Sequence, residues 1–207
     1  YWIDRERRTT IKGLYAAGDV AGGAPKKYVS GAWVEAKIAI RTAIDEIDNV
    51  ELSHINDDEV DKEKERVSHL VSGKEGIPHE ELERIFHEIM DEYAGGATTH
   101  YELTETKLII ARDKLKKLEE KLENLHAEDN HELVSCLELI DRFDVAKVLI
   151  EHLISRQETR WPAYQTRTDY PERDDNNWLG FVNSIYDPVN DRVKIVKRAL
   201  NETLCNI

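Results

Sequence analysis

Two groups of residues near the start of the chain have the types and spacing of a ligand-binding site. A short apolar run ends at Gly18 and Asp19. After a glycine-containing loop, Ser30 and Gly31 open an apolar helix that we expect to run through Ile47. A glycine lets the backbone approach a ligand closely, an aspartate accepts hydrogen bonds from ligand hydroxyls, and free N–H groups at a helix start favour negative charge. The order of these parts predicts one wall of a binding site for a polar cofactor.

The same stretch resembles the carboxyl-terminal FAD-binding segment of the fumarate reductase/succinate dehydrogenase flavoprotein superfamily. Its members have a Thr-x-x-x-Gly-Leu-Tyr-Ala-Ala-Gly-Glu/Asp string, matched by residues 9–19, then a glycine-rich loop with a basic residue and a helix that faces the flavin. The likeness is strongest to the alpha subunits of dissimilatory adenylylsulfate reductases, whose Pro-His-Lys-Phe-Ser-Ser-Gly-Ser loop corresponds to residues 25–32. Those subunits also have a Glu-Thr-Arg-Trp-Pro-x-Tyr string like residues 158–164 and a Phe-Val-Asn-Ser-x-Tyr-Asp string like residues 181–187.

The resemblance implies which residues would bind the cofactor. Asp19, presented beside Gly18, would bind the ribityl hydroxyls of FAD. The backbone N–H groups of Ser30, Gly31 and Ala32 would face the pyrimidine edge of the flavin, where a helix dipole stabilises negative charge. Two simpler interpretations stay open from the sequence: a turn aspartate bonded to its own backbone and an ordinary serine N-cap.

Lys27 is the candidate catalytic residue, because it aligns with the basic residue that contacts anionic substrate in the superfamily, an arginine in fumarate reductases. A lysine there acts as a point charge without the bidentate fork of arginine, and it could neutralise a carboxylate, a sulfate or a developing sulfite. A solvated loop lysine is the alternative. Lys26 stands where adenylylsulfate reductases have a histidine, which leaves the exact substrate open.

Other candidates have structural interpretations. Arg160, Trp161 and Arg167 lie in a segment that packs against the flavin domain in the family, so we expect Arg160 to anchor an ion pair and Trp161 to fill a space between domains. The eight histidines show no HxxxH or HExxH spacing, and the two cysteines, Cys136 and Cys205, have no CxxC spacing. Neither a metal site nor a disulfide framework is therefore expected.

Composition limits the classes of function. The net charge of -13 argues against sequence-independent binding of nucleic acid, which needs a positive surface. The cysteine content makes a reducing, cytoplasmic location the default expectation, and no apolar run is long enough to cross a bilayer. The chain has no GxGxxG and opens at Tyr1 without an initiator methionine. We therefore interpret it as the final third of a larger subunit, with FAD shared with a missing amino-terminal part.

Hydrophobic periodicity predicts most of the elements. Residues 14–17 read as a strand, and the first helix has an apolar stripe that belongs in a core: Trp33, Ala36, Ile40, Ile44 and Ile47. A charged helix capped by Asp57 or Asp58 ends at Gly73, and Pro78 begins the next helix. A leucine seam of the coiled-coil kind follows, at Leu108, Ala111, Leu115, Leu118, Leu122 and Leu125. The chain then returns through Leu133, Leu137, Ile140, Val148, Leu149 and Ile154, and two strands are predicted at residues 181–186 and 192–196.

The expected fold is α+β and mostly helical. It comprises the end of an FAD-binding α/β domain (1–50), a helical bundle (51–159) and an extended, β-rich tail (160–207) that packs back on both.

The resemblance implies an FAD-dependent oxidoreductase subunit that converts adenylylsulfate and two electrons to AMP and sulfite through a flavin N5 adduct. Electrons would come from a ferredoxin-like iron–sulfur subunit, because the chain has no cluster-binding cysteines. One alternative is a fumarate reductase or succinate dehydrogenase type of flavoprotein that acts on dicarboxylates. Another is a helical protein-interaction module without catalysis.

Overall fold

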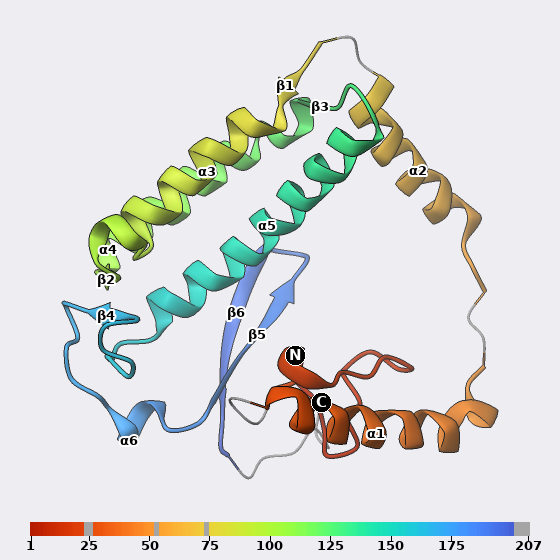
Figure 1. The fold of residues 1–207 in the computed structure, drawn as a ribbon, viewed down its shortest axis with the longest axis horizontal. Helices are drawn as coiled ribbons and strands as arrows, with labels where there is room; N and C mark the ends of the chain where they lie inside the picture. The colour runs from red at the N-terminus through yellow and green to blue at the C-terminus, as the bar shows by residue number, and fades with distance from the viewer. Residues whose placement is uncertain (23–26, 52–53, 73–74, 201–207) are drawn as a thin grey trace. The chain divides into compact units, whose positions relative to one another are not determined.

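The computed structural model describes residues 1–22, 27–51, 54–72 and 75–200. Contacts divide the chain into two units (Figure 1). The first unit comprises Tyr1–His54, Leu179–Asn183 and Val196–Ile207, and the second comprises Ile55–Trp178 and Ser184–Ile195. Residues of the predicted tail, 160–207, therefore contribute to both units.

The first unit is built around helix α1 (Tyr28–Glu46), which is followed by a 3₁₀ turn at Ile47–Asn49. The strand predicted at residues 14–17 is reduced to one antiparallel bridge between Arg8 and Tyr15. A second 3₁₀ turn, Gly18–Val20, comes directly after that short segment. This turn and the start of α1 are the two places that the sequence singled out as a binding wall.

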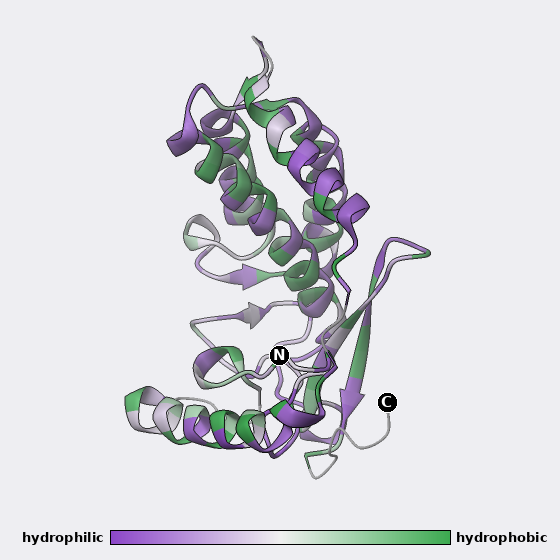
Figure 2. Cartoon of the chain, turned by 90° about the vertical axis from the view of Figure 1, so that its right-hand side faces the viewer, coloured by the Kyte–Doolittle hydropathy of each residue, from purple (hydrophilic) through white to green (hydrophobic). Residues whose placement is uncertain are grey.

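The prediction that the apolar stripe of α1 lies in a core is wrong for this chain. The exposed fractions are 73% for Trp33, 59% for Ile40 and 64% for Ile44. The positions that α1 buries are Glu35, Ala39 and Thr42, which share a different face. A helical stripe becomes buried only when another element packs on it, and within the described part of the first unit the chain packs on the other face. Figure 2 shows hydrophobic colour along this helix.

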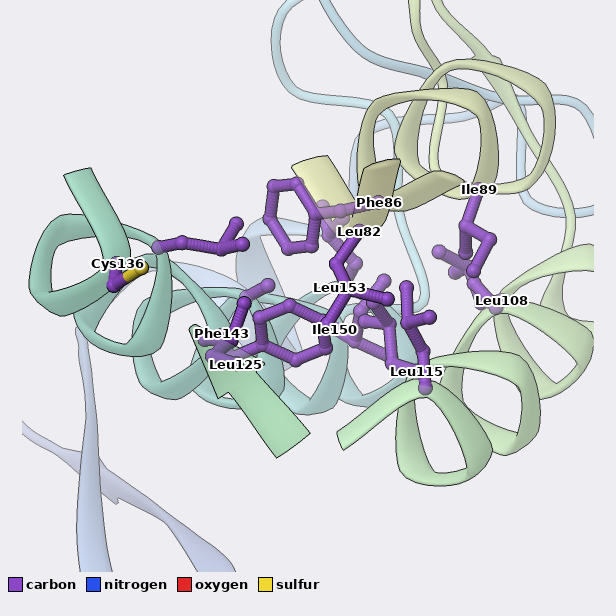
Figure 3. Close-up of a cluster of buried hydrophobic side chains, with 14 of the residues drawn as sticks. Leu82, Phe86, Ile89, Leu108, Leu115, Leu125, Cys136, Phe143, Ile150 and Leu153 are labelled. Atoms are coloured by element: carbon purple, nitrogen blue, oxygen red, sulfur yellow. The ribbon is translucent and has the colours of Figure 1, made fainter. Parts of the chain in front are cut away.

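The second unit has a bundle of three helices, as predicted: α3 (His79–Tyr93), α4 (Glu105–Glu119) and α5 (Asn130–Ser155). Side chains from all three converge on one core (Figure 3). The rings of Phe86 on α3 and Phe143 on α5 lie 5.0 Å apart, centroid to centroid. The predicted seam is confirmed for its first four members, all buried on α4: Leu108, Ala111, Leu115 and Leu118. Leu125 is buried as well, but it lies beyond the end of α4.

The face of α5 was predicted only in part. Leu133, Leu137 and Ile140 are partly buried against the core, whereas Leu149 is 40% exposed. The buried positions are Cys136, Leu139, Phe143, Ala146, Ile150 and Leu153. The helix is apolar on more than one side, so periodicity alone could not decide which side packs on α4.

The other elements are two further helices and short strand pairs. Two two-residue parallel pairs join β1 (Ile77–Pro78) to β3 (Leu125–His126) and β2 (Glu102–Leu103) to β4 (Thr166–Arg167). Helix α2 (Asp57–Ser72) buries only Leu70, and α6 (Asp175–Trp178) is a single turn. The predicted tail strands are confirmed as β5 (Phe181–Asp187) and β6 (Arg192–Arg198), which pair with each other.

The ends of several helices differ slightly from the prediction. Asn56 supplies the cap of α2, since its side chain accepts the N–H of Asp58 at 3.1 Å. Gly73, predicted to end that helix, lies outside the described residues. Pro78 precedes α3 in an extended conformation instead of forming its first turn. The class is nevertheless the predicted one, mostly helical with short strand pairs. Among the described helices, none combines the length and apolar character needed to cross a membrane.

Candidate functional site

The Gly18–Val20 turn lies directly against the first turn of α1. Gly18 has φ +75°, a conformation that residues with a side chain rarely adopt, and a Cβ built on it would meet the Cβ of Ala32 at 3.4 Å. Asp19 and Ser30 are exposed beside this contact. Within the described ranges, the Asp19 carboxylate has no hydrogen-bond partner. The alternative of a turn aspartate bonded to its own backbone is therefore not observed. The structure thus brings together the Gly18–Asp19 turn and the start of α1, which the sequence predicted to form one wall of a site.

A buried carboxylate lies behind this wall. Glu35 of α1 is 8% exposed, and its Oε2 accepts the backbone N–H of Gly18 at 2.9 Å. Lys27 Nζ is 3.0 Å from the same Oε2, and Arg7 Nη2 is 3.4 Å from Oε1. A charge removed from water needs such partners, because an unpaired buried carboxylate is costly. Glu35 was not among the residues that the sequence singled out.

Lys27 is directed into the chain's own backbone. It is 8% exposed, so the alternative of a solvated loop lysine is wrong. Its ammonium donates to the carbonyl oxygen of Gly18 at 2.8 Å and to that of Ala21, and the carbonyl oxygen of Gly22 is 3.4 Å away. Its contact with an anionic substrate stays a prediction. Lys26, the neighbouring candidate, lies outside the described residues.

Helix α1 begins two residues before the predicted start. Tyr28 is its first residue and Lys27 occupies the N-cap position, so Ser30 is the third helical residue and the interpretation as a serine N-cap is wrong. Ser30, Gly31 and Ala32 therefore span the first turn and its end. The N–H groups of the first three helical residues have no partner within their own helix, so that of Ser30 remains available to a ligand. The N–H of Gly31 already donates to the carbonyl oxygen of Lys27 at 2.9 Å.

Arg160 belongs to a separate charged cluster in the second unit. The Glu158 side chain is 0% exposed and accepts hydrogen bonds from Arg160 Nε at 2.7 Å and Nη2 at 2.9 Å. Arg156 Nη1 lies 2.5 Å from Glu158, and Arg160 also pairs with Asp175 at 2.9 Å. Burial alone would raise the pKa of the Glu158 carboxyl, but hydrogen bonds from Arg160, the Asp174 N–H and Arg156 outweigh it and lower the pKa.

Arg167 and Trp161, the other two secondary candidates, differ in burial. Arg167 is 3% exposed and donates to the carbonyl oxygens of Leu153 at 2.6 Å and Arg156 at 2.7 Å, at the end of α5. Trp161 is 58% exposed, and it lines a cavity of about 190 Å³ together with Arg160 and Arg167. The guanidinium groups of both arginines are occupied by protein partners, which favours structural roles for them.

Comparison with known proteins gives the family. A profile described as fumarate reductase flavoprotein C-term matches residues 83–206, more than half of the chain. The chain belongs to this flavoprotein family.

Two relatives of known function align with most of the chain. It is 30% identical to the adenylylsulfate reductase subunit alpha of Megalodesulfovibrio gigas over 93% of this chain and 31% of that protein. It is 25% identical to the succinate dehydrogenase flavoprotein subunit of Bacillus subtilis over 86% of this chain and 32% of that protein. The chain thus spans about a third of the length of these relatives.

Solved structures agree with this placement. The adenylylsulfate reductase of Archaeoglobus fulgidus superposes with a TM-score of 0.88 at 35% identity, over 96% of this chain and 33% of that one. An adenosine-5-phosphosulfate reductase in complex with sulfite, as a covalent adduct, gives the same values. The resemblance inferred from the sequence is confirmed.

Glu35 is the residue of this flavoprotein segment that sequence reasoning missed. It occupies a buried face of α1 together with Ala39 and Thr42, four and seven residues further on. A signal was present: a lone acidic residue in register with small residues, on the side opposite the large apolar ones. The stripe of large residues drew attention to the exposed face instead.

Proposed function

We propose that the chain is the carboxyl-terminal part of an FAD-dependent oxidoreductase subunit of the adenylylsulfate reductase type. The observation that carries the proposal is the packing of Gly18 against Ala32, which sets the exposed Asp19 beside the start of α1. The 35% identity to solved adenylylsulfate reductase structures supports the choice of enzyme.

The residues at this wall fit the cofactor that the family implies. The Asp19 carboxylate, which has no hydrogen-bond partner among the described residues, would accept hydrogen bonds from the ribityl hydroxyls of FAD. The start of α1, at Ser30, Gly31 and Ala32, would face the pyrimidine edge, where the positive end of the helix dipole stabilises negative charge by about 0.3–1 kcal/mol. FAD, when bound, supplies the two-electron chemistry. Gly18 contributes by having no side chain where the backbone must come close.

The proposed reaction converts adenylylsulfate and two electrons to AMP and sulfite. It is supported by the likeness to an adenosine-5-phosphosulfate reductase whose structure holds sulfite. The electron donor proposed by analogy is a ferredoxin-like iron–sulfur subunit. A cytoplasmic location stays a prediction.

The exposed stripe of α1 supports an assignment to a larger flavoprotein. Trp33, Ile40 and Ile44 give one helix face a large apolar area that is accessible in this chain. Apolar patches of this kind mark surfaces that another structure covers. We propose that the remaining two thirds of the subunit, present in the relatives, cover this face.

The test uses the complete protein that carries this chain, purified and scanned for flavin absorbance. We expect bound FAD, bleaching of its visible band by sulfite, and AMP-dependent oxidation of sulfite with an artificial electron acceptor. Asp19→Ala should lower the FAD content, whereas Asp45→Asn, an exposed change near the end of α1, should not. A colourless complete protein would contradict the proposal.

A dicarboxylate reaction is the second candidate, favoured by the 25% identity to a succinate dehydrogenase flavoprotein subunit. The same preparation separates the two. Succinate-dependent reduction of the acceptor, without a response to AMP and sulfite, would assign the second function and overturn the first.

A further inference from the structure

We propose that Glu35 and Lys27 form a clamp that positions the Gly18–Val20 turn for the flavin. The inference rests on the proposed function, since it assigns a role to residues behind the proposed FAD wall. Glu35 and Lys27 are positioning residues in this proposal: they act through Gly18 on Asp19.

The clamp holds both polar backbone atoms of one glycine. Glu35 Oε2 accepts the N–H of Gly18 at 2.9 Å, and Lys27 Nζ donates to the carbonyl oxygen of Gly18 at 2.8 Å. The two charged groups are themselves 3.0 Å apart. One ion pair therefore fixes the peptide units on both sides of Gly18, and the second of these units leads into Asp19.

A glycine needs such an external restraint. Gly18 has the widest choice of backbone conformations and no side chain that could be packed in place. Its left-handed φ of +75° directs the chain so that Asp19 emerges at the surface. Without hydrogen bonds to its N–H and C=O groups, the turn would sample other conformations and Asp19 would lose its fixed direction. Binding would then require ordering of the turn, which weakens affinity.

The same clamp ties the turn to the start of α1. Lys27 occupies the N-cap position, and Glu35 lies two turns into the helix. Ala32, between them, contacts Gly18. The clamp therefore fixes the distance between the carboxylate proposed for the ribityl chain and the start of α1 proposed for the pyrimidine edge. Both parts of the wall would need this fixed spacing to contact one cofactor at once.

The burial of the pair shows that it is not a surface contact. The side chains of Lys27 and Glu35 are 4% and 10% exposed. Arg7 adds a second cation at 3.4 Å from Glu35, so the carboxylate keeps partial compensation when Lys27 is removed. Lys27 has no second carboxylate among its described contacts, so loss of Glu35 leaves its ammonium buried without an ionic partner.

A double-mutant cycle in the complete FAD-binding protein tests the route through Asp19. FAD affinity is measured by quenching of flavin fluorescence on titration of the apoprotein. We expect Glu35→Gln to weaken FAD binding about tenfold and Asp45→Asn to change it less than about twofold. Combined with Asp19→Ala, Glu35→Gln should add less than about a further twofold, because its effect depends on Asp19. Multiplying effects, or wild-type affinity in Glu35→Gln, would overturn the proposal.

A charge-free clamp variant separates positioning from stability. Glu35→Met with Lys27→Met removes both charges, and an apolar replacement of a buried ion pair commonly keeps the fold. We expect thermal unfolding of the apoprotein within a few degrees of wild type and FAD affinity still reduced about tenfold. Wild-type FAD affinity in this variant would show that the clamp has no positioning role. A wild-type FAD affinity in Asp19→Ala would instead refute the cofactor site of the proposed function.

Discussion

Arg167 and Asp169 form a two-pronged ion pair, with Nε and Nη2 of Arg167 each 2.9 Å from a carboxylate oxygen of Asp169. The pair joins two helix ends. Arg167 also donates to carbonyl oxygens at the end of α5, and Asp169 Oδ2 accepts the N–H of Glu105, the first residue of α4, at 2.7 Å. Cations stabilise helix C-termini and anions stabilise N-termini. Arg167 therefore stabilises the end of α5, and Asp169 stabilises the start of α4.

Arg167→Met should lower the free energy of unfolding of the second unit by about 3 kcal/mol. The change leaves Asp169 without its cation and removes the hydrogen bonds from Arg167 to the carbonyl oxygens at the end of α5. Urea denaturation followed by circular dichroism measures this loss. Arg84→Met is the control, since Arg84 and Glu88 form an exposed pair on α3, and it should cost about 0.5 kcal/mol or less. Equal losses in the two variants would contradict a special role for Arg167.

Stability should depend on pH through Asp169. Hydrogen bonds from Arg167 lower the pKa of this carboxyl from its ordinary value of 3.8. A carboxyl with a lower pKa in the folded state adds stability above the pKa of the unfolded chain and loses it as pH falls through the folded value. Wild type should therefore lose more stability than Asp169→Asn between roughly pH 5 and pH 2.

Urea unfolding of both proteins across this range tests that expectation. Asp113→Asn provides the comparison, because Asp113 is 65% exposed on the same bundle. Parallel curves for wild type and Asp169→Asn would show that this carboxyl does not contribute to the acid sensitivity.

Two glycines with left-handed φ give a matched pair of variants in the first unit. A Cβ at Gly13 (φ +82°) meets nothing within 4 Å, whereas a Cβ at Gly18 (φ +75°) meets Ala32. Alanine at either position carries backbone strain of about 1–2 kcal/mol. Only Gly18→Ala should also weaken FAD binding in the complete protein, because only its backbone strain falls on the turn that presents Asp19. Flavin fluorescence titration of both variants decides this, and equal FAD affinities would contradict the proposed wall.

The exposed stripe of α1 should respond differently in the chain alone and in the complete protein. Ile44 is 64% exposed, so Ile44→Gln should change the unfolding free energy of the 207-residue chain by less than about 0.5 kcal/mol. In the complete protein the same change should cost about 2 kcal/mol or more, because a covered isoleucine loses its packing and a polar amide becomes buried. Thermal unfolding of both forms gives the comparison, with Asp45→Asn as the control. A small loss in both forms would show that this helix face stays uncovered.

The sequence predicted the bundle well where one apolar face dominates. On α4, charged residues surround the seam from Leu108 to Leu118, so only one side could be buried. On α5 several sides are apolar, and the buried set could be identified only when α3 and α4 were in place. The stripe of α1 was read correctly as apolar but not as exposed, since periodicity shows which side is hydrophobic and not whether anything covers it.

The proposed site shows a similar division. Gly18 and Asp19 could be singled out because their types match a ligand wall, and their packing against Ala32 is observed. Glu35 shares its helix face with Ala39 and Thr42, which is a visible signal, but its role could not be assigned from the sequence. One of its partners is the backbone N–H of Gly18, and backbone atoms leave no mark in a sequence. The parallel pairs β1–β3 and β2–β4 were missed for a related reason: strands of two residues are too short to show alternation.

The contacts of Arg167 with the end of α5 also determine how the chain would respond to proteolytic cleavage. Tyr164, at the tip of the turn between Trp161 and Gln165, is 79% exposed. Contacts across that turn join the two sides: Arg160 pairs with Asp175, and Arg167 donates to the carbonyl oxygen of Leu153 at the end of α5. A protease that nicks the turn would produce two fragments that stay associated and separate only under denaturing conditions.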